Sequence, residues 1–278
     1  MAEYGLKVKI WGVRGSLAAP FSDRMKYGGN TSCVSAQWED GIVVFDAGSG
    51  IRALGQELLE CTNLQKRELH IFFSHLHLDH ICGLPFLPQL FQKDWTIHLY
   101  GEKGFCEKLK QVIHPPYWPV GFDQMAAAII WHEFMPGEAA EPAEGVTVHT
   151  IRSSHPDNTV LFRLEYQQSR IVYGLDCELT DSYLEKYCDF VSGSNLLIFD
   201  GMYTDEEYER FRGFGHSTWE QGIRILKQSS IGTLCISHHD WGQTDELLDN
   251  RERLARFHDE RCMFAREGMT FYFEGDKT

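Results

Sequence analysis

The chain has 278 residues, a formal net charge of −14 and 43% apolar residues, so it can bury a sizeable core. It lacks the start of a signal peptide, and no apolar run approaches the roughly 20 residues that cross a bilayer. We therefore expect a soluble, cytoplasmic protein without a membrane partner. The acidic charge argues against polymeric nucleic acid, which usually binds a basic surface. A small anionic substrate stays compatible, because bound metal ions reverse the local field.

Apolar runs bounded by turn residues predict many strands, with helices between groups of them. Strands are expected over residues 7–11, 33–38, 42–45, 69–73, 96–100, 129–134, 146–151, 160–166, 170–173, 196–199, 233–237 and 269–273. Helices are expected over residues 51–60, 83–91, 104–113, 180–187, 204–211, 217–228 and 245–265. This order predicts two sheets packed face to face with helices outside, in one domain over residues 1–278.

Two segments are expected as loops. Residues 136–145, with Gly, Ala, Glu and Pro, are predicted to form an exposed loop. Residues 114–124, HPPYWPVGFDQ, either pack on the core or form a wall of the functional site.

The eight cysteines form no C-x-x-C pair, so a structural zinc knuckle is not expected. Most of them lie in apolar runs and are predicted to be buried, reduced thiols.

The segment SHLHLDHICG, residues 74–83, carries most of the chemical information. It follows an apolar strand and holds four potential metal ligands within six residues, namely His75, His77, Asp79 and His80. A sharp loop at a strand end can turn two of these side chains each way, so two metal ions could share it. Imidazole and carboxylate suit Zn²⁺, and also Mn²⁺ or Fe²⁺.

Further donors stand where other predicted strands end. His155 follows the strand ending at residue 151, Asp176 follows the strand 170–173, and His238 follows the strand 233–237. Strand ends are rigid platforms from which loops carry chemistry. Together with the first motif they complete five His and two Asp, the set that a two-metal hydrolytic site requires.

The motifs SHLHLDH, SSHP, YGLDC and SHHD, in this order, resemble those of the metallo-β-lactamase superfamily. The resemblance implies an α/β fold, a four-layer αβ/βα sandwich. It implies one metal ion on His75, His77 and His155 and a second on Asp79, His80 and His238, with Asp176 and a hydroxide bridging the two. Asp46, in FDAGSG, is similar to an Asp that supports the ligands; the alternative is a turn-forming Asp before Gly.

Two features resemble the phosphodiesterase branch of that superfamily. Asp176 stands where lactamases commonly have Cys, and Gly215-His216-Ser217-Thr218 is similar to the branch's His-x-Thr signature. The resemblance gives His216 a catalytic role at the phosphate or the leaving oxygen. The alternative is that Ser217 or Thr218 caps a helix and His216 is incidental.

Only 21 positions separate His155 from Asp176, which leaves room for one β-hairpin. This is similar to the cyclic phosphodiesterases, whereas bacterial tRNA 3′-processing endonucleases insert a long tRNA-grasping arm there. We therefore expect a small phosphodiester substrate of the cyclic nucleotide type, cleaved by a metal-bridging hydroxide. Asp79 and His216 are the expected catalytic residues, and no polymeric nucleic acid is expected as a partner. A thioester or lactone hydrolase is the alternative, and a homodimer is left open.

Three further residues are open between two roles. Arg14 and Asn30 lie in Gly-rich loops and either face the substrate or form turns and salt bridges. His239 either supports a ligand or binds substrate, or is a surface residue beside His238.

Overall fold

The computed structural model describes residues 5–61 and 66–275, and two seven-stranded sheets form its centre. The first sheet has the order β16 (Thr270–Phe273), β1 (Leu6–Gly12), β3 (Cys33–Trp38), β4 (Gly41–Phe45), β5 (Glu68–Phe72), β6 (Thr96–Glu102) and β7 (Ala128–Phe134). The second has the order β15 (Cys262–Phe264), β13 (Thr233–Ser237), β12 (Leu196–Asp200), β11 (Ser169–Gly174), β10 (Val160–Tyr166), β9 (Val146–Arg152) and β8 (Ala139–Ala143). A short pair, β2 (Arg14–Gly15) and β14 (His239–Asp240), joins the two halves of the chain.

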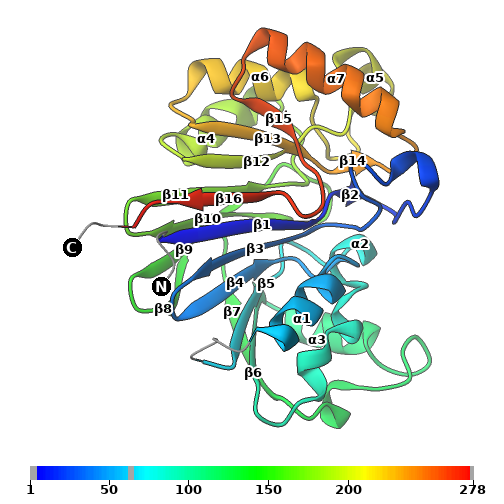
Figure 1. The fold of residues 1–278 in the computed structure, drawn as a ribbon, viewed down its shortest axis with the longest axis vertical. Helices are drawn as coiled ribbons and strands as arrows, with labels where there is room; N and C mark the ends of the chain where they lie inside the picture. Colours follow the sequence, from blue (N-terminus) through cyan, green and yellow to red (C-terminus); the bar gives the residue numbers. More distant parts are fainter. Residues whose placement is uncertain (1–4, 62–65, 276–278) are drawn as a thin grey trace.

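Helices cover the outer face of each sheet (Figure 1). Next to the first sheet lie α1 (Ile51–Glu60), α2 (Leu78–Ile81) and α3 (Phe105–Val112). Next to the second lie α4 (Asp181–Val191), α5 (Asp205–Phe211), α6 (Trp219–Gln228) and α7 (Asp245–His258). Short 3₁₀ helices span Ser22–Arg24, Leu84–Phe86, Pro88–Phe91 and Phe122–Gln124. The predicted four-layer α/β sandwich is confirmed.

Parallel strands lie side by side in each sheet. They run from β4 to β7 in the first sheet and from β11 through β12 and β13 to β15 in the second. Helices connect most of these strands. The strands β4, β5, β12 and β13 are buried on both faces, which explains their continuous apolar runs in the sequence. Parallel strands end at the same edge of their sheet, so the segments that follow them meet there.

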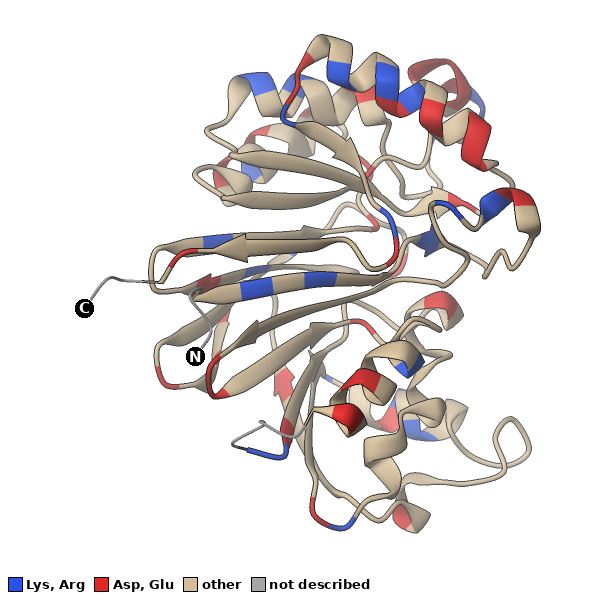
Figure 2. Ribbon diagram, viewed as in Figure 1, with Lys and Arg blue, Asp and Glu red and all other residues tan. Residues whose placement is uncertain are grey.

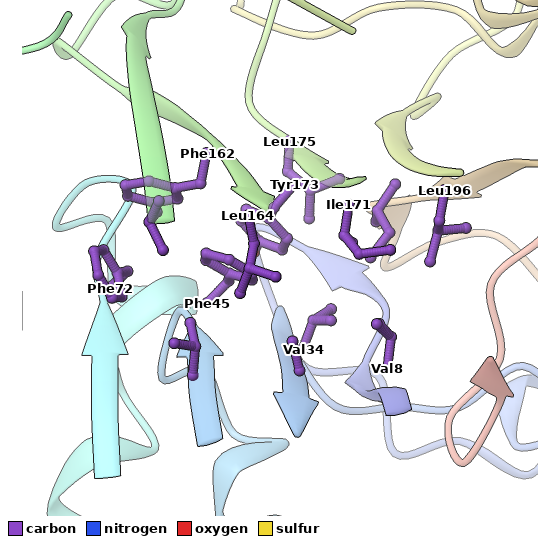
Figure 3. Packing of buried hydrophobic residues seen from close by; sticks show 14 of the residues in the cluster. Val8, Val34, Phe45, Phe72, Phe162, Leu164, Ile171, Tyr173, Leu175 and Leu196 are labelled. Atoms are coloured by element: carbon purple, nitrogen blue, oxygen red, sulfur yellow. The ribbon is translucent and has the colours of Figure 1, made fainter. Parts of the chain in front are cut away.

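The core between the two sheets is rich in aromatic side chains (Figure 3). Phe45 of the first sheet stacks on Phe162 and Tyr173 of the second, with ring centroids 5.5 and 5.4 Å apart. Aromatic pairs at these separations add stabilisation beyond the area that they bury. The strand ends that carry the polar motifs therefore stand on a tightly packed base.

Four predicted elements differ from the structure. The helix expected over residues 83–91 is replaced by two 3₁₀ helices, Leu84–Phe86 and Pro88–Phe91, because Pro85 and Pro88 interrupt an α-helix. The expected loop 136–145 contains β8, an edge strand whose Ala residues and Pro142 give little strand signal, although an edge position tolerates Pro. The helix expected to reach residue 265 ends at His258, and β15 follows; no Gly or Pro marks this end in the sequence. The predicted ligand loop contains the single helical turn of α2.

All eight cysteines are free, and Cys33, Cys177, Cys235 and Cys262 are buried. Cys61 and Cys82 are exposed, so the prediction of burial holds for only part of the set. In the described part of the chain, no helix is both long and apolar enough to cross a membrane.

Candidate metal centre

Strand ends from both sheets bring the seven predicted ligands to one edge of the sandwich. His75, His77, Asp79 and His80 follow β5, and His155, Asp176 and His238 follow β9, β11 and β13. Asp176 and His238 have left-handed backbones, with φ of 54° and 61°. Such conformations are costly for residues with a side chain and concentrate at functional sites, where the surrounding structure holds them.

Three histidines form the first cluster, His75, His77 and His155. One potential ligand atom from each lies within 4.8 Å of the other two. Asp176 approaches this cluster with Oδ1, which is 3.8 Å from Nε2 of His75 and 3.9 Å from Nε2 of His155.

The second cluster contains Asp79, His80 and His238, again with potential ligand atoms within 4.8 Å of one another. Asp176 approaches it with its other oxygen, Oδ2, which is 3.2 Å from Nε2 of His80 and 3.4 Å from Nε2 of His238. The two carboxylate oxygens of Asp176 thus face different clusters.

Several buried polar atoms in these clusters make no hydrogen bond. They are Nε2 of His75, His80 and His238, and Oδ2 of Asp176. Some lie only 3.2–3.4 Å from one another, yet their directions do not suit a hydrogen bond. Buried polar groups without partners are costly, and divalent cations bound at the two clusters would satisfy these atoms. The residues present therefore fit the metal ions that the fold implies.

Asp46 fixes the first motif, residues 74–83, through hydrogen bonds to its carboxylate. It follows β4 with a φ of 59°, and its carboxylate accepts hydrogen bonds from the backbone N–H and the hydroxyl of Ser74. It also accepts from Nδ1 of His80 at 2.7 Å and from the hydroxyl of Tyr173 at 2.8 Å. Since Ser74 Oγ in turn lies 3.0 Å from Nδ1 of His75, two ligand rings are oriented with Nε2 free. The supporting role is therefore favoured over the turn-forming one.

The remaining ligands of the first cluster have partners of their own. Nε2 of His77 lies 2.7 Å from a carboxylate oxygen of Asp157, which leaves Nδ1 for a metal ion. Nδ1 of His155 lies 3.0 Å from the hydroxyl of Thr159, which leaves Nε2.

His216 stands beside both clusters, with its ring centroid 5.8 Å from that of His155 and 5.0 Å from that of His238. Its Nδ1 donates to Oδ2 of Asp200 at 2.8 Å, which leaves Nε2 available. Thr218 caps α6, as one alternative from the sequence supposed, and Asp200 orients the ring of His216.

Hydrogen bonds to Glu178 fix the loop before His216. Glu178 accepts hydrogen bonds from the backbone N–H groups of Gly213 and Gly215. Gly215 has a φ of 92°, and a Cβ there would lie 2.2 Å from the His155 ring. Only glycine therefore allows His155 and His216 to approach each other in this way.

The buried charges of the site shift one another's pKa. Burial disfavours ionised Asp176, but His238 and His80 outweigh this effect and hold its pKa well below the usual range. Burial opposes protonation of His238, yet Asp176 and Asp79 raise its pKa to about 9. Burial lowers the pKa of His155 to about 4. Without metal the second cluster therefore holds protons, which must leave when a cation binds.

The three residues that were open between two roles are structural. The fully buried Arg14 donates to the backbone carbonyls of Gly28 and Gln243. Asn30 donates to Glu267. His239 is not a surface residue, because it is fully buried and its Nε2 lies 3.0 Å from the Ala265 carbonyl.

The loop 114–124 packs on the helix-covered outer face of the first sheet. The Trp118 ring meets Phe86, and the Phe122 ring meets Trp131, at centroid distances of 4.9 Å. A cavity of about 420 Å³ beside His75 and His77 is not lined by this loop. The packing role is therefore favoured over the wall of the site.

Sequence reasoning missed Asp200. The carboxylate ends β12, accepts from the Asp176 backbone N–H at 3.0 Å and orients His216. Its signal was present, because an apolar run ends in Asp here as it does at Asp46. Asp157 and Glu178 gave no such signal, since they lie in polar segments and act through contacts that only the fold creates.

A four-layer sandwich with clustered His and Asp ligands at one edge defines a metallohydrolase. The beta-lactamase superfamily domain matches residues 42–239. The chain is 30% identical to ribonuclease Z of Pyrococcus abyssi over 262 residues, covering 75% of this chain and 80% of that protein. Its fold is similar to a diphosphatase from the PhnP family (TM-score 0.72, 17% identity, 97% and 98% of the two chains). It is also similar to the short form of human tRNase Z (TM-score 0.70, 19% identity, 96% and 99%).

The chain belongs to the beta-lactamase superfamily, as the sequence motifs predicted. It is a metal-dependent hydrolase of the phosphodiesterase type, and the fold implies divalent metal ions at the His/Asp clusters.

The expectation of no polymeric nucleic acid partner is wrong. The relatives that align with most of the chain are ribonucleases, and RNA is a polymer. The net charge of −14 led to this wrong expectation because it sums the charges of the whole chain, whereas substrate binding depends on the charges near the site. Figure 2 shows acidic and basic residues mixed along the outer helices.

Proposed function

We propose that the chain is a dinuclear metal-dependent phosphodiesterase, with residues 1–278 acting as one hydrolase domain. The observation that carries this proposal is the carboxylate of Asp176, whose two oxygens face two clusters with unpaired buried atoms. In this proposal His75, His77 and His155 hold one ion, and Asp79, His80 and His238 hold the other. Zn²⁺ suits these ligands, and Mn²⁺ or Fe²⁺ are alternatives.

Two such ions, when bound, lower the pKa of a water molecule and neutralise the charge of a phosphodiester. Asp79 then has a second task in addition to metal binding. Its Oδ2 accepts a hydrogen bond from the backbone N–H of Ser16 at 2.8 Å, which fixes the carboxylate. A fixed carboxylate at this position can orient the attacking water by accepting a hydrogen bond from it.

His216 protonates the leaving oxygen in this proposal. An alkoxide is a poor leaving group, so a proton donor is worth about 10²–10⁴ in rate. Asp200 accepts from Nδ1 of His216 and leaves Nε2 to carry the transferred proton. A thiolate leaves without protonation, so this His–Asp pair favours phosphodiester over thioester hydrolysis.

Two substrate classes have support. A small phosphodiester, such as a cyclic nucleotide, is supported by the interval between His155 and Asp176, which holds only the hairpin of β10 and β11. An RNA substrate is supported by the relatives named ribonuclease Z.

A substrate panel tests the proposal. Protein reconstituted with Zn²⁺ or Mn²⁺ is assayed on bis(p-nitrophenyl) phosphate, cyclic nucleotides, an RNA with a 3′ extension, thioesters and lactones. We expect phosphodiester cleavage, and the relative kcat/KM then separates the small ester from RNA. Hydrolysis of thioesters or lactones alone would contradict the proposal.

A further inference from the structure

A cavity of about 420 Å³ lies directly beside the first metal cluster. His75 and His77 form one wall, so the cavity is continuous with the proposed site. The neighbours of these histidines in the chain, Phe73, Ser74 and Leu76, also line it. The end of β6, the start of α3 and the loop after β9 supply the other lining residues, namely Glu102, Lys103, Phe105, Lys108, Asp157 and Asn158.

Both acidic residues of this lining already have hydrogen-bond partners. Glu102 accepts two hydrogen bonds from the guanidinium of Arg152, and Asp157 pairs with His77. Lys103 and Lys108, by contrast, take part in none of the salt bridges between described residues. A neutral His77 does not cancel the charge of Asp157, so the lining holds two lysines against one uncompensated carboxylate. The net charge of the cavity lining is therefore positive, although the chain as a whole carries −14.

We propose that this cavity binds a second phosphate group of the substrate, through Lys103 and Lys108. The inference rests on the proposed phosphodiesterase function and deepens it. The scissile phosphodiester would lie at the His/Asp clusters, and a further anionic group on the same molecule would reach the neighbouring cavity. Lys ammonium groups bind phosphate as compact point charges. Two lysines that form no salt bridge within the described part of the chain bind a dianionic group more tightly than a neutral pocket would.

Such a phosphate has two chemical sources. It is either a terminal monophosphate on a small phosphodiester or the next phosphate along an RNA strand. Both present the same group to Lys103 and Lys108, so the recognition chemistry is shared and the experiment must distinguish them.

Matched ligands isolate the second phosphate. Thymidine 3′-(p-nitrophenyl phosphate), with and without a 5′-phosphate, reports turnover by colour. Thymidine 3′,5′-bisphosphate and thymidine 3′-monophosphate report binding to the metal-loaded protein by calorimetry, without any need for turnover. We expect the 5′-phosphate to lower KM and Kd by about tenfold or more, the effect of one charge-assisted hydrogen bond.

The double variant Lys103→Gln/Lys108→Gln should lose this preference and leave kcat on the ester without a 5′-phosphate unchanged. Lys110→Gln is the matched control, because Lys110 lies on the same helix but outside the cavity lining and is paired with Glu107. An equal preference in the double variant and the wild type, or no preference in the wild type, overturns the inference.

The same variants tested on an RNA trinucleotide, with the next phosphate either native or a neutral methylphosphonate, identify the source. Loss of the preference with RNA alone assigns the cavity to an RNA strand, and loss with the mononucleotide alone assigns it to a terminal phosphate. If neither ester is cleaved, the proposed function fails, while the calorimetric comparison still decides whether the cavity binds phosphate.

Discussion

At the scale of single residues, the site depends on a few strained positions behind buried strands. Asp46, Asp176 and His238 each follow a strand, and each has a positive φ, between 54° and 61°. This turn takes the side chain out of the alternation of the strand and aims it along the edge of the sandwich. The strain is tolerable because buried side chains pack the strands below it, as the stacking of Phe45 on Tyr173 illustrates.

The first prediction concerns Asp176. Asp176→Ala should abolish phosphodiester hydrolysis, because the residue that faces both clusters is lost, while the circular dichroism spectrum stays that of the wild type. Asp189→Ala, at an exposed position of α4, is the control and should keep full activity. Near-wild-type turnover of Asp176→Ala at saturating metal would show that the residue is misassigned.

The second prediction concerns His216. His216→Ala should lose roughly 10²–10⁴ in rate on an alkyl phosphodiester and much less on an aryl phosphodiester, whose phenolate leaves unaided. The metal content should not change, and the control His258→Ala, at the end of α7, should behave as the wild type. Equal losses on both esters would mean that His216 binds the phosphate rather than donating a proton.

At the scale of the elements, the sequence predicted the strands that are buried on both faces, because continuous apolar runs mark them. It missed β8 and β15, whose edge positions and short lengths leave little pattern, and it merged β15 with α7. Alternation and turn residues report burial and chain reversal, whereas a three-residue edge strand exists only because a neighbouring strand is there to pair with it.

The site was predictable to the extent that its residues stand in short motifs. The seven ligand positions lie next to apolar runs, so their spacing was informative. The sequence marks Asp200 as an Asp at the end of an apolar run, but its role required the fold, because nothing in the sequence says that the end of β12 lies beside His216. The role of Arg14 was equally hidden, since its carbonyl partners lie up to 229 positions away in the chain.

The third prediction concerns a histidine stack on β5, β6 and β7. The rings of His70 and His98 stack with centroids 4.5 Å apart, and Nδ1 of His98 lies 3.0 Å from Nε2 of His132. Burial, together with repulsion from His98 and His132, lowers the pKa of His70 to about 3. In the unfolded chain it titrates near 6.5, so the unfolded state takes up the proton first as the pH falls.

The contribution of neutral His70 to the free energy of unfolding is therefore complete above about pH 6.5. It is lost as the pH falls towards 3, with a slope of about 1.4 kcal/mol per pH unit. Urea unfolding of metal-free protein between pH 7 and pH 4 measures this slope. In His70→Leu the slope of stability against pH should be smaller than in the wild type by the contribution of about one bound proton. Parallel curves for wild type and His70→Leu would contradict the prediction.

At the scale of the whole molecule, the metal centre joins the two halves of the sandwich. The first sheet supplies the motif after β5, and the second supplies His155, Asp176 and His238. The parallel pairing of β2 with β14 ties the halves together beside His238. Because neither sheet holds a complete ligand set, metal binding should depend on the packing between the sheets.

The central claim is a phosphodiesterase that needs two metal ions. It is tested most directly by the rate of bis(p-nitrophenyl) phosphate hydrolysis as Zn²⁺ or Mn²⁺ is added stepwise to metal-free protein. We predict that the rate rises until two equivalents per chain are bound and then stays constant. Saturation at one equivalent, or no hydrolysis at any metal content, would contradict the account.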